Sequence, residues 1–272
     1  MKKSLITAII GLTAIMFFYS CKKTVAPANL VASWTNFALK TTYENPAPAG
    51  RTETGTITIE LYDDNTVKWS ATIVGLTAGD VITGGHIHAG DATTNGPVIV
   101  NFNPSFSATG TASGSVSISS TLADSLKTKP IYVNFHSTAF PGGLIRAQLD
   151  KTIDVAFEVN LTGGAEVPAV VTTATGKALL RLMSDKTLYY KVTVSNLEAA
   201  DALAVSHIHK AAAGVNGSVF INLIAPADAT QFGLAKSIVL DDTQILSLKT
   251  DAIYVNAHST MRPGGVVRGQ IR

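Results

Sequence analysis

The sequence predicts an all-β protein, with two tandem antiparallel Greek-key β-sandwich domains after a short N-terminal signal segment. Three observations predict it. Apolar and polar residues alternate with a period of two in many short segments, the second half of the chain repeats the first, and an apolar run opens the chain. A length of 272 residues suits two domains of ordinary size.

The alternation of apolar and polar residues marks the strands. It is clearest in residues 57–61 and 67–73 of the first half and in residues 178–182 and 188–194 of the second. Asp63-Asp64-Asn65 and Ser184-Asp185-Lys186 read as polar turns between these strands. Each half has one segment with a helical pattern, at 121–127 and 241–248. Many short strands separated by Gly, Asn and Pro turns are typical of a sandwich or barrel.

The internal repeat keeps one register over more than a hundred residues. His86-Ile87-His88 recurs 121 positions later as His207-Ile208-His209, and Ile131–Thr138 recurs 122 positions later as Ile253–Thr260. One large domain with coincidental motifs would not keep this spacing. We therefore divide the chain into a signal peptide (residues 1–20), a tether (21–29), a first domain (30–149) and a second domain (153–272).

The first twenty residues resemble the signal peptide of a lipoprotein. Lys2 and Lys3 precede an apolar run from Leu5 to Tyr19, which as a helix is about 22 Å long and too short for a bilayer core of about 30 Å. The run stops at Cys21, in a relaxed lipobox-like context. We expect lipidation of Cys21 and an extracytoplasmic protein held on the cell envelope, at the outer membrane of a Gram-negative bacterium. The alternatives are an uncleaved anchor or an ordinary signal peptide.

Composition excludes several other functions. Hydrophobic residues make up 46% and charged residues 15% of the chain, and the formal net charge is +2. Lys2 and Lys3 account for that charge, so the rest of the chain carries no basic surface for nucleic acid. Cys21 is the single cysteine, which excludes an internal disulfide and a cysteine metal site in the domains.

All six histidines fall in the repeated motifs, three in each copy. They are His86, His88, His136, His207, His209 and His258. On a strand, the two histidines of a His-x-His pair share one face. Two interpretations stay open: a three-histidine site for zinc or copper in each domain, or a hydrogen-bonded network without metal. No carboxylate follows both His-x-His pairs at an equivalent position, which favours the network.

A polar row accompanies the histidines. Alternation puts these side chains on the same face as the third histidine and on the strand after the Pro-Gly-Gly loop: Tyr132, Asn134, Arg146 and Gln148 in the first copy, and Tyr254, Asn256, Arg268 and Gln270 in the second. No Ser/His/Asp set recurs in both copies, so we expect no catalytic activity. The recurring acids Glu44 and Glu166, each in a Glu-x-Pro motif, are interpreted as structural.

The second copy resembles a CHRD domain, the module first described in chordin-type extracellular proteins. The matching residues are Leu161–Pro168, Thr173–Gly176, Ser206–His209, Asn216-Gly217, Ile253–Ser259 and Pro263–Gln270. The first copy matches in its second half and departs at Thr42–Pro46 and at Ala147, where the second copy has Gly269. The resemblance implies an Ig-like β-sandwich outside the cytoplasm, with no defined biochemical role.

A fainter likeness links Gly85-His86-Ile87-His88 to the Gly-x-His-x-His strand of copper/zinc superoxide dismutases. Those enzymes need more metal ligands than three histidines, so fold ancestry does not imply dismutase activity here. The sequence therefore predicts a lipid-anchored binding or structural protein whose partner is an unidentified extracytoplasmic protein or glycan. The alternative is a zinc- or copper-binding protein, or a redox enzyme derived from one.

Overall fold

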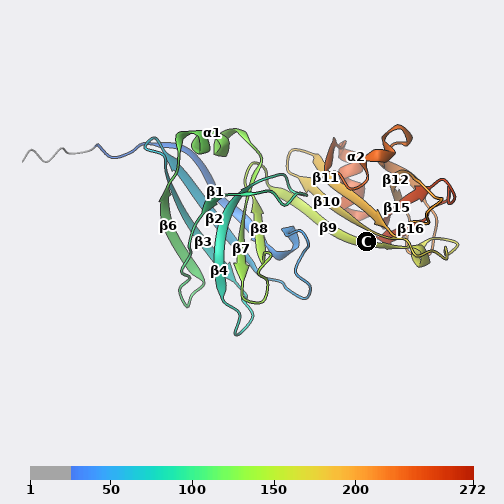
Figure 1. Ribbon diagram of the computed structural model, residues 1–272, viewed down its shortest axis with the longest axis horizontal. Coiled ribbons are helices and arrows are strands. Elements are labelled where there is room, and N and C mark those ends of the chain that lie inside the picture. Colours follow the sequence, from blue (N-terminus) through green and yellow to red (C-terminus); the bar gives the residue numbers. More distant parts are fainter. Residues whose placement is uncertain (1–25) are drawn as a thin grey trace, which may run out of the picture.

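The computed structural model describes residues 26–272 (Figure 1). The signal segment and Cys21 lie outside the described residues, so their assignment stays a prediction. Within residues 26–272, no helix is long and apolar enough to cross a membrane. The predicted all-β class is confirmed. We call residues 30–149 module 1 and residues 153–272 module 2.

Each module contains eight strands and one α-helix. Module 1 consists of β1 (Leu30–Lys40), β2 (Thr54–Tyr62), β3 (Thr66–Val74), β4 (Ile82–Ala89), β5 (Val98–Asn101), β6 (Thr111–Ser117), α1 (Ser120–Thr128), β7 (Ile131–Ser137) and β8 (Ile145–Gln148). Module 2 repeats this order with β9 (Ile153–Thr162), β10 (Thr175–Met183), β11 (Thr187–Ser195), β12 (Leu203–Lys210), β13 (Ser218–Ile224), β14 (Lys236–Val239), α2 (Asp242–Thr250), β15 (Ile253–Ser259) and β16 (Val267–Gln270). Both helices lie within two residues of the predicted bounds.

The eight strands of a module form one antiparallel sheet that curls on itself. Its order is β5-β4-β7-β8-β1-β2-β3-β6 in module 1, and module 2 has the equivalent order β13-β12-β15-β16-β9-β10-β11-β14. The two halves of each sheet join through a single residue pair, Lys40 with Arg146 or Thr162 with Arg268. A connection this narrow acts as a corner, so the halves fold over each other like the two layers of a sandwich.

The apolar side of each curled sheet forms the core. In module 1, Ile57 and Trp69 from one half pack in the same buried cluster as Ile87 and Val133 from the other half. Ile87 is fully buried, as the alternation around His86 and His88 predicts. Short helices close the remaining side, and their first turns are capped by Ser119 and Asp241. The polar face of β4, β7 and β8 is therefore the side turned away from this core.

The two modules contact each other closely. The Tyr43 hydroxyl donates to the Ile153 carbonyl at 2.8 Å, and both residues share a small apolar cluster with Met183. Arg181 on β10 is fully buried; it donates to the carbonyl oxygens of Phe157 at 2.6 Å and of Glu44 at 3.0 Å. Module 2 thereby fixes the backbone of the Glu-x-Pro segment of module 1.

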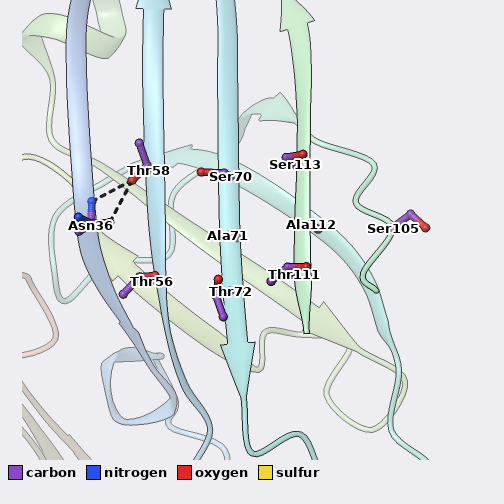
Figure 2. Close-up of a pocket in the computed structure, with 10 residues that line it drawn as sticks. All are labelled: Asn36, Thr56, Thr58, Ser70, Ala71, Thr72, Ser105, Thr111, Ala112 and Ser113. Atoms are coloured by element: carbon purple, nitrogen blue, oxygen red, sulfur yellow. Dashed lines mark hydrogen bonds between the residues drawn. The ribbon is translucent and has the colours of Figure 1, made fainter. Parts of the chain in front are cut away.

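In module 2, the outer face of the sheet that carries Arg181 packs against module 1. The matching face of module 1, on β2, β3 and β6, is open and carries hydroxyl groups (Figure 2). Thr58 lies across from Ser70, which lies across from Ser113 on β6. Thr56, Thr72 and Thr111 form a second row in the same way, and the two rows line a hollow of about 530 Å³. The face that packs against module 1 in the second copy is thus a hydrophilic surface in the first.

Candidate metal centre

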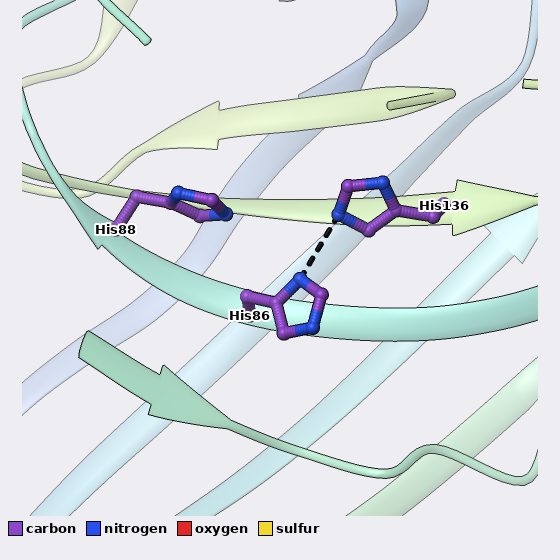
Figure 3. Close-up of side chains that lie close together, drawn as sticks. All are labelled: His86, His88 and His136. Carbon is purple, nitrogen blue, oxygen red and sulfur yellow. Dashed lines mark hydrogen bonds between the residues drawn. The ribbon is translucent and has the colours of Figure 1, made fainter. Parts of the chain in front are cut away.

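Strand pairing brings the three histidines of each copy together. His86 and His88 lie on β4 and His136 on β7, and Gly84 is the residue directly across from His136. The His136 ring points toward His86 on the neighbouring strand (Figure 3). The potential ligand atoms of the triad His86, His88 and His136 all lie within 4.8 Å of one another.

Module 2 builds the same arrangement from His207, His209 and His258, whose potential ligand atoms also lie within 4.8 Å of one another. The Nδ1 atom of His207 is 3.3 Å from Nε2 of His258, and the equivalent His86–His136 distance is 2.9 Å. The predicted clustering of three histidines per copy is therefore confirmed in both modules.

Backbone carbonyl groups fix the hydrogen position on two rings of the first triad. Nδ1 of His88 lies 2.9 Å from the Gly96 oxygen, and Nδ1 of His136 lies 2.8 Å from the Pro141 oxygen. A carbonyl oxygen only accepts, so in each ring Nδ1 carries the hydrogen and donates it. Nε2 of both rings is therefore a lone pair: that of His136 accepts from Nδ1 of His86, and that of His88 has no partner among residues 26–272.

The same anchoring occurs in module 2, where the carbonyl oxygens of Gly217 and Pro263 accept from His209 and His258, each at 2.9 Å. Donating one ring nitrogen to a backbone carbonyl is the usual way in which proteins orient a metal-binding histidine. A carboxylate is not required for this role, so the absence of an adjacent acid in the sequence does not favour the metal-free interpretation.

Burial disfavours the charged form of His86, His88 and the three histidines of module 2. Desolvation and the neighbouring histidines lower the pKa of His86, and likewise of His207, from 6.5 to about 4. Burial also lowers the pKa of His88, His209 and His258. Neutral imidazole is the form that binds a metal ion. At neutral pH these five imidazoles are therefore in the form that binds metal without first releasing a proton.

An aromatic ring and a guanidinium group support the middle of each triad. The Tyr132 ring stacks on the His88 ring with centroids 4.8 Å apart. The Arg146 guanidinium carbon lies 3.4 Å from the centroid of the Tyr132 ring. Tyr254, His209 and Arg268 repeat the stack at 4.7 and 3.3 Å. These contacts limit ring movement of the second histidine in each triad.

The polar row is buried except for Gln270, which is partly buried, and it holds a loop in place. Arg146 donates to the carbonyl oxygens of Asp91 at 2.6 Å and Thr94 at 3.1 Å, and Gln148 donates to the Gly90 oxygen at 3.0 Å. In module 2, Arg268 and Gln270 donate to carbonyl groups of the equivalent loop. Asn134 pairs with Arg146 across the strands, and Tyr132 pairs with Gln148, which confirms the predicted shared face.

The sequence model of the CHRD domain matches residues 35–149 and 157–271, which together cover most of the chain. The chain belongs to the CHRD family. Both matched segments fall within the two predicted domains, and both contain all three histidines of their module. No curated protein and no solved structure matches the chain.

Each CHRD module also contains a buried acid that the sequence interpretation left out of the site. Glu44 and Glu166 are 4% and 6% exposed, and burial raises the pKa of each carboxyl to about 7, against the opposing effect of Arg146 or Arg268. Each carboxyl lies against a glycine of the Pro-Gly-Gly loop, Gly143 or Gly265, in the space that a Cβ atom would occupy. The recurrence of Glu-x-Pro in both copies was the available signal for these acids.

Proposed function

We propose that this CHRD protein is a metal-binding protein of the cell envelope, in which each module binds one zinc or copper ion through its three histidines. The observation that supports this most directly is the tautomer of the anchored rings. In both modules two histidines donate Nδ1–H to backbone carbonyls, so that their Nε2 atoms are lone pairs, and the potential ligand atoms of the three rings lie within 4.8 Å of one another. Three imidazoles of this kind suit zinc or copper.

Metal binding involves a rearrangement of hydrogen at the first histidine. Because Nε2 of His136 is a lone pair, Nδ1 of His86 donates the hydrogen of the 2.9 Å contact between these rings. A cation between the rings replaces that hydrogen bond, and the His86 hydrogen moves to Nε2. In this proposal the metal ion takes the place of the hydrogen bond between His86 and His136.

The role is binding rather than catalysis, since no nucleophile and base recur in both copies. In this proposal the protein is held on the envelope through lipid on Cys21, outside the cytoplasm, and an extracytoplasmic protein or glycan is its macromolecular partner. The support for this part is the apolar run that ends at the single cysteine. Replacing Cys21 with Ser should abolish acyl labelling and membrane retention; survival of both would overturn the anchor.

Elemental analysis tests the metal sites. The full chain, purified without a histidine tag and incubated with zinc or copper, should keep two metal ions per chain after dialysis. His209→Gln should keep one, because module 1 is intact, and His88→Gln should do the same through module 2. A chain that stays metal-free after incubation and dialysis would support the purely hydrogen-bonded network and overturn metal binding.

A further inference from the structure

A buried amide lies at the centre of each polar face, beside the triad. Asn134 lies on β7 directly across from His86 on one side and Arg146 on the other, and Asn256 has the equivalent place in module 2. The two side chains are 4% and 2% exposed. Neither has access to bulk water, so each amide needs partners inside the protein.

The amide oxygen points at the triad. In module 2, Oδ1 of Asn256 is 3.1 Å from Nε2 of His258. His258 donates its Nδ1–H to the Pro263 carbonyl, and its Nε2 lies 3.3 Å from Nδ1 of His207, which donates to it, so Nε2 is a lone pair. Two hydrogen-bond acceptors therefore face each other at contact distance. A cation at this point would be attracted by both atoms and would remove their repulsion.

In module 1 the acceptor atoms beside the triad belong to Asn134 and His88. Oδ1 of Asn134 and Nε2 of His88 are both buried, and neither has a hydrogen-bond partner among residues 26–272. A buried acceptor without a partner destabilises the folded state. The feature that recurs in both modules is the buried Nε2 of the second histidine, His88 or His209, which has no hydrogen-bond partner among residues 26–272. An acceptor atom in this position suits a positively charged partner.

The buried acid sets the orientation of the amide. The Asn134 side chain hydrogen-bonds the Glu44 carboxyl, and the Asn256 side chain hydrogen-bonds the Glu166 carboxyl; both contacts lower the pKa of the acid. A carboxylate accepts, so the amide nitrogen faces the acid. The oxygen of the same amide then faces the histidines. Glu44 and Glu166 therefore act on the metal site through asparagine, without touching the triad.

We propose that Asn134 and Asn256 are the fourth ligands of the two metal sites, each through Oδ1, and that Glu44 and Glu166 are positioning residues that hold the amide oxygen toward the ion. This inference rests on the proposed metal-binding function and adds an oxygen to a site of three imidazole nitrogens. Such a set favours the divalent ions Zn²⁺ and Cu²⁺ over Cu⁺, which prefers soft sulfur ligands.

The crystal structure of the zinc-loaded full chain is the first test. Oδ1 of Asn256 at about 2.0–2.2 Å from zinc, the usual oxygen–zinc distance, would establish the ligand. A water molecule in that position, with Oδ1 outside the coordination sphere, would overturn the inference while leaving the three-histidine site intact. Zinc absent from both triads would overturn the proposed function itself, so the two failures are distinguishable.

Matched variants give a second test in solution, with module 1 as the internal reference. Asn256→Leu keeps the side-chain shape and should weaken Zn²⁺ binding at module 2 at least tenfold, whereas Asn256→Asp keeps an oxygen ligand and should bind at least as tightly as wild type. Glu166→Leu should also weaken binding, by tenfold or more, because it releases the amide. Glu166→Gln keeps an acceptor for the amide and is the control.

Cobalt substitution separates ligation from a general loss of structure. The visible absorption of Co²⁺ at module 2 should change in Asn256→Leu and Glu166→Leu but stay like wild type in Glu166→Gln. Thermal unfolding of the metal-free variants shows which of them remain folded. Folded Asn256→Leu with unchanged zinc affinity and unchanged cobalt spectrum would overturn the inference.

Discussion

The two modules contain equivalent histidine triads but differ in what surrounds them. In module 1 the Glu-x-Pro segment lies against module 2, which holds it through Arg181 and through a 2.8 Å bond from the Ala47 amide to Glu158. In module 2 the equivalent segment begins at Glu166, and its Val167 carbonyl accepts from Asn216 of the same module at 2.7 Å. The comparison teaches that duplication conserved the site and changed the outer face of the sheet.

The changed face can be traced to single positions. Leu179 and Arg181 on β10 are buried against neighbouring residues, whereas the matching residues on β2, Thr58 and Glu60, are only partly buried. Arg181 provides hydrogen-bond donors for the contact between modules, and Leu179 provides buried apolar area on the same face. Threonine and glutamate at the same positions in module 1 keep its face hydrophilic.

Arg181→Ala should break this comparison most strongly. The substitution leaves the carbonyl oxygens of Glu44 and Phe157 without their buried donor and opens a cavity, at a cost of about 3 kcal/mol in the free energy of unfolding. Urea denaturation measures the loss. Glu60→Ala, the matching change in module 1, should alter the stability by less than about 0.5 kcal/mol. Equal effects of the two substitutions would mean that Arg181 does not hold the modules together.

Glu44→Gln should change the pH dependence of stability. The pKa of Glu44 is raised from 4.5 to about 7 in the folded chain. Its stabilising contribution is therefore fully present below pH 4.5 and is lost as the pH rises through 7. Gln is neutral throughout, so the stability of the variant relative to wild type should rise between pH 4.5 and 7, by up to about 3 kcal/mol.

Wild type and Glu44→Gln contain the same histidines, so the titration of these histidines cancels in the stability difference between the two proteins. Glu166→Gln is the matched change in module 2 and should give the same direction, since its pKa is also raised to about 7. Urea midpoints at several pH values measure both variants. Parallel profiles for wild type and Glu44→Gln would show that this carboxyl titrates normally and is not held in a dry environment.

The sequence predicted the fold well because it depends on alternation, which each strand carries locally. The same reasoning placed His86, His88 and His136 on one face. It also predicted that the polar rows of β7 and β8 lie side by side. It missed the roles of Glu44 and of the carbonyl groups that fix the rings. Glu44 reaches the site from the β1 end through Asn134, and such a contact depends on how loops fold over the sheet rather than on any local pattern.

Glu158→Gln should weaken the contact between modules by about 1 kcal/mol. The Glu158 carboxylate accepts from the Ala47 amide and also pairs with Lys177. The amide of Gln can still accept one of these bonds, but it loses the charge that strengthens both. Calorimetric unfolding compares it with Arg181→Ala, which should be the more damaging of the two. If Glu158→Gln lowered the free energy of unfolding as much as Arg181→Ala, the main contact between modules would be on β9 rather than on β10.

Thr72→Val should have the smallest effect, within about 0.5 kcal/mol in unfolding experiments. Thr72 lies on the open hydroxyl face of module 1 between Thr56 and Thr111, and valine has the same shape and suits a strand. The face of module 2 that corresponds to it carries Leu179, where Leu179→Thr should cost more than 1 kcal/mol because a buried apolar side chain is lost. If both changes were neutral, the two outer faces would be equivalent in energy, and the contact between modules would rest on Arg181 and Glu158 alone.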